Sequence, residues 1–341
     1  MPIGILGYGV YIPRYRIKGE EYARAWGSFA AAGVSEKSLP GYDEDVVTMA
    51  IEASHNALRR AQREGSELDA IYLATTSAPY EEKSAATTLA AALGAHEVRT
   101  ADFGASTKAG TTALLAGLDR VRAEGPGPVL AVASDCPLAA PDSNLEHALG
   151  AGAAAFVLGE GDPVAVMEAA FSYARETLGE RFRRQGEPYT RDLELRVTHF
   201  EEVLQTVIDG LLKRLGKTAA DIDQVVLQQP DARRPVRGVA KFGFAREKMN
   251  LGHLVPLTGD TGAASTLLGL AAVLDQAQGS QRVVVASYGS GAGDALSLLT
   301  GEGLSARRGL APTVADYLHN KSYVDYVTYL KLRRILSTAA G

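Results

Sequence analysis

Cysteine is almost absent from this 341-residue sequence, in which Cys136 is the only one. A single cysteine excludes a disulfide within the chain and any Cys-x-x-Cys metal site. The six histidines form no His-x-x-His or His-x-x-x-His pair, which are spacings that place two imidazoles on one metal ion. We therefore expect no disulfide framework and no metal.

An excess of one charge and long apolar runs are lacking as well. The 35 Lys and Arg face 40 Asp and Glu, a formal net charge of -5, and the basic residues are scattered. No basic footprint for nucleic acid is present. No run is long enough to cross a membrane, and the N-terminal stretch MPIGILGYGVYIPRYRI has no basic segment before its apolar part. We expect a soluble, cytoplasmic protein that binds neither nucleic acid nor membranes.

Strand-like and helix-like segments alternate along the chain, and this alternation predicts an α/β fold. Ile3–Tyr11 and Ala70–Ala74 are apolar runs typical of buried strands. Asp43–Arg63 repeats apolar residues at close to 3.6 spacing, which predicts an amphipathic helix.

An internal repeat is the most informative pattern. The stretch AGTTALLAGLDRV from Ala109 is similar to AASTLLGLAAVLD from Ala263, and each precedes an apolar strand that ends in Ala-Ser. A second strand ending in Gly-Glu-Gly follows in both copies, and the spacing from helix start to the serine is 27 residues (Thr107 to Ser134) and 26 residues (Thr261 to Ser287). Two similar halves predict pseudo-twofold symmetry around the helices 107–122 and 262–276. Their N-termini offer unpaired N–H groups and a positive dipole end, so the functional residues are expected there.

The motifs resemble those of the archaeal and bacterial hydroxymethylglutaryl-CoA (HMG-CoA) synthases, a branch of the thiolase superfamily. The resemblance covers essentially the whole chain and rests on GILGYGVYIPRYRI, PGYDEDVVTMAIEA, STKAGTTA, QQPDARRPVRGVAKFGF, GDTGAASTLLGLAAVLD and SYGSGAGDALSL. It implies a thiolase fold, with two pseudo-symmetric βαβαβαββ halves (1–165 and 166–341) in αβαβα layers. A homodimer joined sheet edge to sheet edge near 98–103 is also implied.

The resemblance further implies that this chain lacks the three residues that perform the family's condensation. Thr107 stands where the family has the cysteine that accepts the acetyl group, and a threonine hydroxyl has a pKa far above neutrality. Gln228 stands at the family's histidine, and an amide can donate a hydrogen bond but cannot shuttle a proton. Thr76 stands at the glutamate that acts as general base, and Asp260 replaces an asparagine that positions the substrate.

The remaining nucleophile candidates each have a structural alternative. Ser106 or Thr107 is either a hydroxyl acyl acceptor with Asp260 as its base, or a helix-capping residue. Asp260 is itself either a ligand-contacting acid or a cap at a helix start. Lys108 is expected to be structural. Cys136 follows a strand and is either a buried thiol or a displaced nucleophile.

Three further features suggest little chemistry. His147 and His253 are lone histidines, more typical of core or surface positions than of catalysts. The glycine-rich turn at 289–293 lies between two strands and opens no helix, so it is not a dinucleotide-binding motif. In the resembling enzymes this turn lines the active-site cleft.

A basic segment after Gln228 is the predicted site for coenzyme A. Residues 233–248 hold six Lys or Arg against one Glu. The resemblance places this segment at the mouth of the pantetheine tunnel, where cations would meet nucleotide phosphates. The residues that we expect to contact CoA are Arg233, Arg234, Lys241 and Lys248, although a solvated helix face explains each of them equally well.

Three functions are compatible with these residues. The first is a non-condensing acyl-CoA-binding subunit that associates with a thiolase and an OB-fold protein. The second is an active acyl-CoA acyltransferase or C–C lyase with a changed mechanism, in which Gln228 polarises a thioester carbonyl. The third, full HMG-CoA synthase activity, is the least compatible with Thr107 and Gln228.

Overall fold

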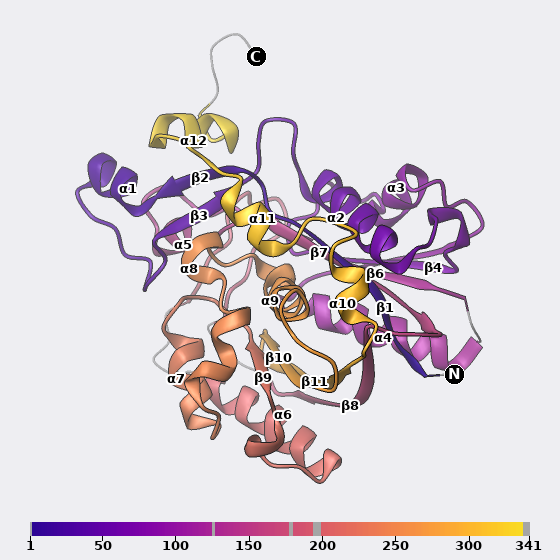
Figure 1. Cartoon of the computed structure of the whole chain (residues 1–341). Coiled ribbons are helices and arrows are strands. Elements are labelled where there is room, and N and C mark those ends of the chain that lie inside the picture. The colour runs from indigo at the N-terminus through magenta and orange to yellow at the C-terminus, as the bar shows by residue number, and fades with distance from the viewer. Residues whose placement is uncertain (1, 125–126, 177–179, 194–198, 337–341) are drawn as a thin grey trace.

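The computed structural model describes residues 2–124, 127–176, 180–193 and 199–336 (Figure 1). Its strands are β1 (Ile3–Tyr11), β2 (Tyr15–Lys18), β3 (Glu36–Leu39), β4 (Ala70–Ala74), β5 (Arg99–Phe103), β6 (Val129–Asp135), β7 (Gly152–Glu160), β8 (Ala165–Ala174), β9 (Gln224–Leu227), β10 (Arg282–Gly289), β11 (Ala292–Thr300) and β12 (Ser322–Tyr323). Its α-helices are α1 (Gly19–Trp26), α2 (Val46–Ala61), α3 (Ala85–Ala92), α4 (Ala109–Glu124), α5 (Asn144–Ala148), α6 (His199–Leu215), α7 (Arg234–Lys241), α8 (Val255–Thr258), α9 (Ser265–Leu274), α10 (Leu304–Arg308), α11 (Val314–His319) and α12 (Tyr326–Leu332). None of the helices in these ranges is long and apolar enough to span a membrane.

The strand order shows the duplication that the sequence predicts. The main sheet runs β5-β4-β6-β7-β1-β8-β11-β10-β9. Read outward from the centre, β1-β7-β6-β4 in the first half is matched by β8-β11-β10-β9 in the second. The halves meet through the antiparallel pairing of β1 and β8, where Gly4 lies opposite Val166 and Ile5 opposite Ala165. The proposed division of the chain at residue 165 stays a prediction.

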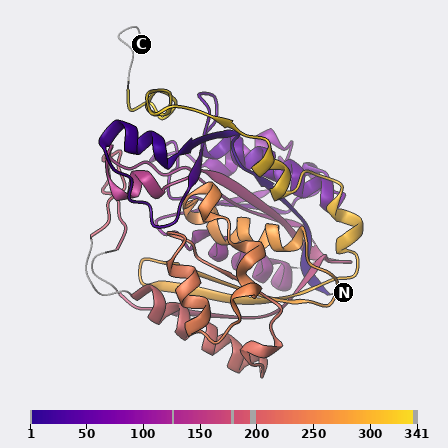
Figure 2. The ribbon, with the colours of Figure 1, turned by 60° about the vertical axis from the view of Figure 1, so that its left-hand side comes forward.

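Five layers result from this duplication. Helices α2 and α3 pack on the first half of the sheet and α6 packs on the second, while α4 and α9 lie between the halves. Figures 1 and 2 show α9 at the centre of the molecule. All ten residues of α9 are buried, as expected for a helix that is apolar on every side. The predicted αβαβα layering is therefore confirmed.

The two central helices begin slightly later than the sequence suggests. Helix α4 begins at Ala109 rather than at Thr107, and α9 begins at Ser265 after a 3₁₀ turn at Gly262–Ala264. Gly262 has φ +55°, and a Cβ there would overlap the Asp135 carboxylate. The left-handed backbone delays the regular helix, and glycine is the residue that accepts it at least cost.

A small lobe beside the layers was not evident from the repeat. Its three-stranded sheet has the order β12-β2-β3, and α1 and α12 pack beside it (Figure 1, upper left). This lobe brings the C-terminal part of the described chain back to the N-terminal part.

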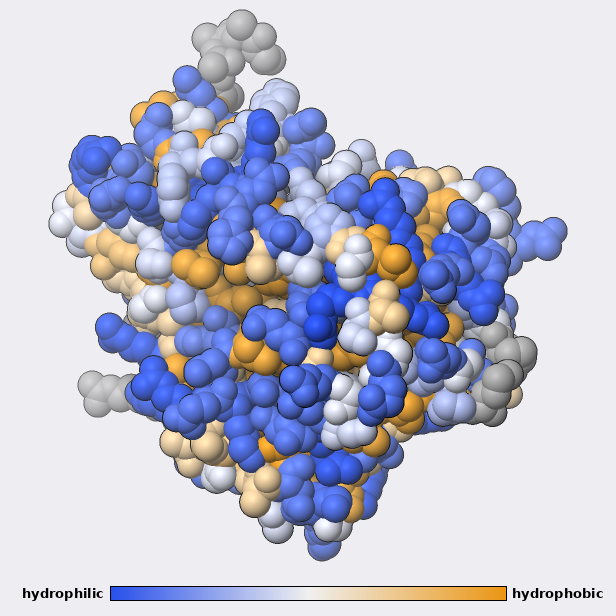
Figure 3. Space-filling model, viewed as in Figure 1, coloured by the Kyte–Doolittle hydropathy of each residue, from blue (hydrophilic) through white to orange (hydrophobic). Residues whose placement is uncertain are grey.

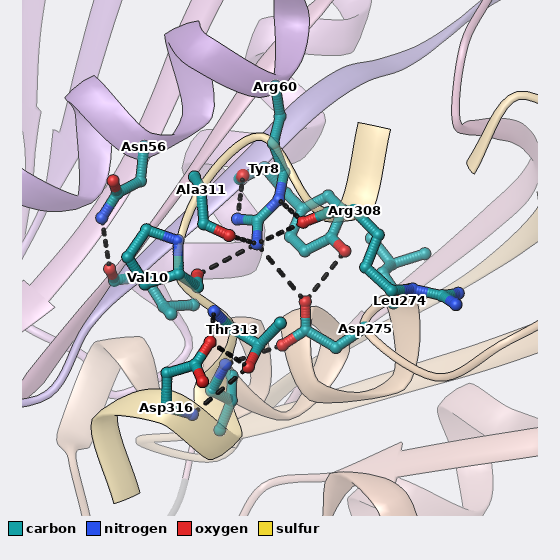
Figure 4. A network of polar contacts seen from close by, with 12 residues as sticks. Tyr8, Val10, Asn56, Arg60, Leu274, Asp275, Arg308, Ala311, Thr313 and Asp316 are labelled. Carbon is teal, nitrogen blue, oxygen red and sulfur yellow. Dashed lines mark hydrogen bonds and ion pairs between the residues drawn. The ribbon is translucent and has the colours of Figure 1, made fainter. Parts of the chain in front are cut away.

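The C-terminal segment is also held by a buried network around Arg60 (Figure 4). The Arg60 guanidinium is fully buried and donates to the carbonyls of Tyr8, Arg308, Ala311 and Pro312. Its Nη2 lies 3.6 Å from Asp275 Oδ1 on the end of α9, and that carboxylate accepts hydrogen bonds from the Tyr8 hydroxyl (2.9 Å) and the Val314 amide (2.7 Å). One guanidinium thus ties α2, β1 and the segment 308–312 together.

Candidate active site

A cavity of about 670 Å³ opens at the carboxyl ends of β4, β9 and β10. Its wall includes the residues just before α4 and before the turn at 262–264, so both halves contribute. The five predicted catalytic residues all line it: Thr76, Ser106, Thr107, Gln228 and Asp260. The structure therefore brings them together, while their roles stay predictions. The hydropathy surface in Figure 3 shows apolar residues gathered in a hollow between the α1 lobe and α7.

Thr107 is held across the boundary between the halves. Its Oγ1 donates a 2.8 Å hydrogen bond to the carbonyl of Tyr288 at the end of β10. Ser106 Oγ accepts from the Lys108 amide at 3.3 Å. A side chain at Gly289 would overlap both hydroxyls, so glycine is required for this close approach. Ser106 Oγ thus accepts from a backbone amide, as a capping hydroxyl does, whereas the Thr107 hydroxyl donates to a carbonyl oxygen of the other half.

Lys108 belongs to a structural network. Its Nζ lies 2.9 Å from Asp294 Oδ2 and 2.9 Å from Thr112 Oγ1. Asp294 also accepts from Thr111 Oγ1 (2.9 Å) and Ser172 Oγ (2.8 Å). This agrees with the predicted structural role of Lys108, since its ammonium is bound to a buried carboxylate.

Asp260 is a buried acid, with 4% of its surface exposed. Its Oδ2 lies 2.9 Å from Arg181 Nη1, and its Oδ1 accepts from the Gly262 amide at 2.9 Å. Burial raises the pKa of Asp260, and the Arg181 charge opposes this shift only in part. No hydrogen bond joins Asp260 to Ser106 or Thr107 in the described part of the chain. The hypothesis that Asp260 activates one of these hydroxyls finds no support in the geometry.

Gln228 adds an unsatisfied acceptor. Its Nε2 donates to the carbonyl of Gly262 at 3.2 Å, whereas its Oε1 is buried and has no hydrogen-bond partner in the described chain. Because Nε2 is fixed on a carbonyl, the amide orientation is determined by that bond. A buried acceptor without a partner costs free energy.

Thr76 is bound to a carboxylate behind the cavity wall. Its Oγ1 donates to Asp135 Oδ2 at 2.7 Å, and the hydroxyl of Ser77 donates to the same carboxylate. Asp135 also accepts from the amide of Ala263 at 2.9 Å, at the start of the second central helix. The end of β6 in the first half thus contacts the residues just before α9. In the same way, the end of β10 in the second half contacts the residues just before α4.

Several proteins that resemble this chain over nearly its whole length share one name. A hydroxymethylglutaryl-CoA synthase of Methanothermobacter thermautotrophicus is 40% identical over 346 residues, covering 98% of this chain and 99% of that protein. Another, from Thermococcus onnurineus, is 38% identical over 339 residues, covering 97% and 96%. The chain belongs to the HMG-CoA synthase family. No family model matches it.

Solved structures confirm the fold of this HMG-CoA synthase family member. The structure named MvaS in complex with 3-hydroxy-3-methylglutaryl coenzyme A superposes with a TM-score of 0.84 at 19% identity, over 100% of this chain and 94% of that one. The 3-oxoacyl-[acyl-carrier-protein] synthase III of Aquifex aeolicus superposes with a TM-score of 0.77 at 22% identity, over 87% and 99%. The predicted thiolase-like α/β fold is therefore confirmed.

A cap segment over the cavity, defined by residues 180–193, was missed by the sequence reasoning. Glu180 accepts a hydrogen bond from the Tyr288 hydroxyl, Arg181 pairs with Asp260, and Arg183 Nη2 donates to the Thr76 carbonyl at 3.3 Å. These contacts join residues 79 to 108 positions apart in the chain. No periodic pattern in the sequence signals an irregular segment fixed in this way.

His199 at the start of α6 is the second missed residue, and it also lines the cavity. Its Nδ1 lies 3.5 Å from Glu202 Oε2. The two histidines that the sequence did single out lie elsewhere. His147 Nδ1 accepts a hydrogen bond from the amide of Ala30, a cavity-lining residue, at 3.1 Å. His253 is not among the described residues that line the cavity, and burial lowers its pKa.

The predicted CoA-binding cations divide into two groups. Arg234 lines the main cavity, and with Arg233 it lines a neighbouring hollow of about 570 Å³ that also includes Arg237. Lys241 pairs with Glu201 at 2.9 Å, and Lys248 Nζ donates to the carbonyls of Ala219 and Ala220. The geometry favours contact with a ligand for the arginines and a structural role for the two lysines.

Cys136 is not among the described residues that line the cavity. It follows β6, and burial raises the pKa of its thiol. A thiol that is kept protonated in this way is a poor nucleophile, which favours the structural alternative over a displaced catalytic cysteine. In the described ranges no cluster of His, Cys, Asp and Glu has the geometry of a metal site.

Proposed function

We propose that this protein binds an acyl-CoA thioester in the main cavity and acts on it as an acyltransferase or C–C lyase, without forming an acyl-cysteine. The observation that carries this proposal is the gathering of Thr76, Thr107, Gln228 and Asp260 in one cavity of about 670 Å³, a size typical of small-molecule sites. Relatives named HMG-CoA synthase support the thioester, and two similar solved structures contain HMG-CoA or CoA.

The residues suit direct action on the bound substrate. The Thr107 hydroxyl donates to a carbonyl oxygen rather than to a base, so it has no partner that would activate it as a nucleophile. Asp260 is buried and its raised pKa brings it closer to neutrality, which suits proton exchange with the substrate. The second N–H of the Gln228 side chain can donate to a thioester carbonyl. Making or breaking a C–C bond next to a thioester requires proton exchange and polarisation of the carbonyl more than it requires an acyl-enzyme.

A coenzyme A nucleotide would extend from the main cavity toward the neighbouring hollow. Arg234 lines both spaces, and Arg233 and Arg237 lie beyond it. Guanidinium groups bind phosphate oxygens through paired hydrogen bonds, so we assign the nucleotide phosphates to these arginines. Lys241 and Lys248 are left out of this assignment because neither of them lines the main cavity or the neighbouring hollow.

Intact-mass spectrometry after incubation with acetyl-CoA tests the proposal, together with an assay for release or transfer of the acyl group. Wild type is expected to remain unmodified yet to turn over an acyl-CoA substrate. The variant Thr107→Cys in a Cys136→Ser background is expected to gain one acetyl group, since its only thiol then lies in the cavity. Acetylation of wild type that Ser106→Ala or Thr107→Ala abolishes would instead establish a hydroxyl nucleophile.

The same experiment separates the alternative function, a non-condensing subunit. The wild-type protein could bind acyl-CoA, show no turnover alone, and gain activity only with a thiolase and an OB-fold protein. This result would support a subunit of a complex and contradict an independent enzyme. Formation of HMG-CoA from acetyl-CoA and acetoacetyl-CoA by the pure protein would contradict the non-condensing subunit and establish full synthase activity. Failure to bind any CoA thioester would contradict the use of this cavity.

A further inference from the structure

One histidine on the wall of the main cavity takes no part in the proposed function. His199 is the only histidine among the described residues that line this cavity, and 14% of its side chain is exposed. It is the first residue of α6, the helix that packs on the second half of the sheet. An imidazole can take up and release a proton near neutral pH, so a histidine at this place can perform acid–base chemistry on a bound ligand.

The two ring nitrogens of His199 have different surroundings. Nδ1 is buried, has no hydrogen-bond partner in the described chain, and lies 3.5 Å from Oε2 of Glu202, one turn further along α6. Nε2 is not one of the buried atoms without a partner, and no hydrogen bond within the described ranges uses it. Nε2 therefore keeps accessible surface. Because His199 lines the cavity, Nε2 is the nitrogen that a ligand there can contact.

Glu202 gives this imidazole a preferred tautomer. Its Oε2 also accepts a 3.4 Å hydrogen bond from Arg175 Nη1, and both of these side chains are more than half exposed. A carboxylate beside Nδ1 favours the proton on Nδ1, leaves the lone pair on Nε2, and stabilises the imidazolium that forms when Nε2 takes a proton. A separation of 3.5 Å is too long for a good hydrogen bond, but such contacts in enzymes often shorten in the complex with substrate.

Three residues already assigned to the chemistry of the cavity are less suited to accept a proton. Both carboxylate oxygens of Asp260 are engaged as hydrogen-bond acceptors. The amide of Gln228 does not exchange protons at neutral pH, and the Thr107 hydroxyl donates its own proton to a carbonyl oxygen. The lone pair on Nε2 of His199 supplies the base that these groups do not.

We propose that His199 is the general base of the main cavity and that Glu202 positions its imidazole. Nε2 takes a proton from the carbon next to the thioester carbonyl, and the electron pair of that C–H bond moves to the carbonyl oxygen to give an enolate. Return of a proton from Nε2 to the carbon restores the thioester, so the step needs no further reactant. The inference rests on the proposed function, because it assumes that a CoA thioester occupies the cavity.

Hydrogen exchange at the carbon next to the carbonyl measures this step alone. Acetyl-CoA, propionyl-CoA and butyryl-CoA are incubated with the protein in D₂O, and mass spectrometry follows the deuterium gained by each acyl group. Wild type is expected to catalyse exchange in at least one of them. His199→Gln keeps a polar side chain but has no basic nitrogen, so the exchange rate at saturating ligand should fall about 100-fold or more. His199→Ala should regain exchange when imidazole is added, which a purely structural loss would not allow.

Matched variants make the test specific. His96→Ala should exchange like wild type, because His96 is exposed and outside the cavity lining. Glu202→Gln should slow exchange by about tenfold, less than the loss of a buried partner of a histidine would, because Glu202 is exposed. Glu201→Gln, which affects only the pair with Lys241, should leave the rate unchanged.

Calorimetric binding of S-butyl-CoA, an unreactive thioether, separates loss of chemistry from loss of the site. The affinity of each variant should stay within about twofold of wild type, since a base that acts on the reacting carbon contributes to the rate and not to ground-state binding. Exchange by His199→Gln at the wild-type rate, or no rescue of His199→Ala by imidazole, overturns the inference. A wild type that binds S-butyl-CoA but exchanges none of the three thioesters overturns it as well. Failure of wild type to bind S-butyl-CoA contradicts the proposed function itself, and the inference with it.

Discussion

At the residue scale, the side chains that line the cavity differ in how fully their hydrogen-bonding groups are occupied by neighbours. The Thr107 hydroxyl donates to the Tyr288 carbonyl, and both carboxylate oxygens of Asp260 accept hydrogen bonds, whereas the amide oxygen of Gln228 has no hydrogen-bond partner in the described chain. The position of a residue in a family motif therefore does not show whether its side chain is reactive, because reactivity also depends on its hydrogen-bond partners.

Substitutions at Thr107 and Asp260 should differ in their effect. Thr107→Val removes one hydrogen bond and is expected to lower the free energy of unfolding by about 1 kcal/mol, with turnover reduced by no more than a few-fold. Asp260→Asn keeps the shape but cannot exchange a proton, so turnover should fall by about 100-fold or more. Steady-state kinetics with urea unfolding of each variant checks both values. An inactive Thr107→Val with normal stability would show that the hydroxyl participates in the chemistry.

The site could be predicted from the sequence only where a motif marks it. Thr76, Thr107, Gln228 and Asp260 were found because each lies in a segment that matches the family, and the repeat placed two of them at helix starts. Arg181 was missed because its importance comes from an ion pair with a residue 79 positions away. Composition also misjudged Lys248, since a count of charges in a segment cannot show that one ammonium turns inward onto backbone carbonyls.

At the element scale, a salt bridge ties three strands of the second half. Glu168 on β8 accepts two 2.8 Å hydrogen bonds from Arg282 on β10 and one of 2.7 Å from Ser297 on β11, which lies between them. The hydrogen bonds from Arg282 lower the pKa of Glu168, although burial opposes this shift. The pair thus joins strands that do not contact each other directly.

A pH dependence follows from this lowered pKa. The stabilisation is fully present above the ordinary glutamate pKa of 4.5 and is lost as the pH falls through the lower folded-state pKa. Glu168→Gln should therefore unfold about 1–2 kcal/mol more easily than wild type at pH 7, and this difference should shrink as the pH falls below 4.5. Urea unfolding across that range measures it, with exposed Glu82→Gln as the control. A difference that does not depend on pH would argue that the loss comes from packing alone.

The elements themselves were largely predictable. Strands β1 and β4 begin and end where the apolar runs predict, because buried strands leave a direct signature in composition. The starts of α4 and α9 were placed two to three residues too early, because contacts between the halves fix Thr107 and Gly262 outside the regular helices. The α1 lobe was missed because it joins segments from opposite ends of the chain.

At the scale of the whole molecule, the Arg60 network of Figure 4 should contribute strongly to stability. Arg60→Met would leave the Asp275 carboxylate and several backbone carbonyls buried without their partner. Removal of one member of a buried pair typically costs about 3–5 kcal/mol, so thermal unfolding should show a large loss. The exposed Arg63→Met change, which breaks a surface pair with Glu67, should cost under about 1 kcal/mol.

Association of two copies is predicted along β5. This strand is at the edge of the main sheet and carries the partly buried Ala101 and Phe103, and α4, which contacts β5, carries the incompletely covered Leu115 and Ala116. An edge of this kind invites pairing with a second chain. Light scattering after size exclusion should give a dimer, and Leu115→Lys should shift it to a monomer. A monomeric wild-type protein in this measurement would contradict the predicted dimer.

The contacts that cross between the halves have a practical consequence. Thr107 of the first half is bound to Tyr288 of the second, and Ala263 of the second is bound to Asp135 of the first, so the cavity exists only while both halves are docked. A ligand that fills the cavity contacts both halves and stabilises their docking for as long as it is bound. At 100 times its dissociation constant such a ligand adds about 2.7 kcal/mol to the free energy of unfolding. A ligand that binds more tightly should therefore raise the melting temperature of the protein further. Thermal unfolding with a panel of CoA derivatives, each at the same concentration, would rank their affinities and indicate the preferred acyl group.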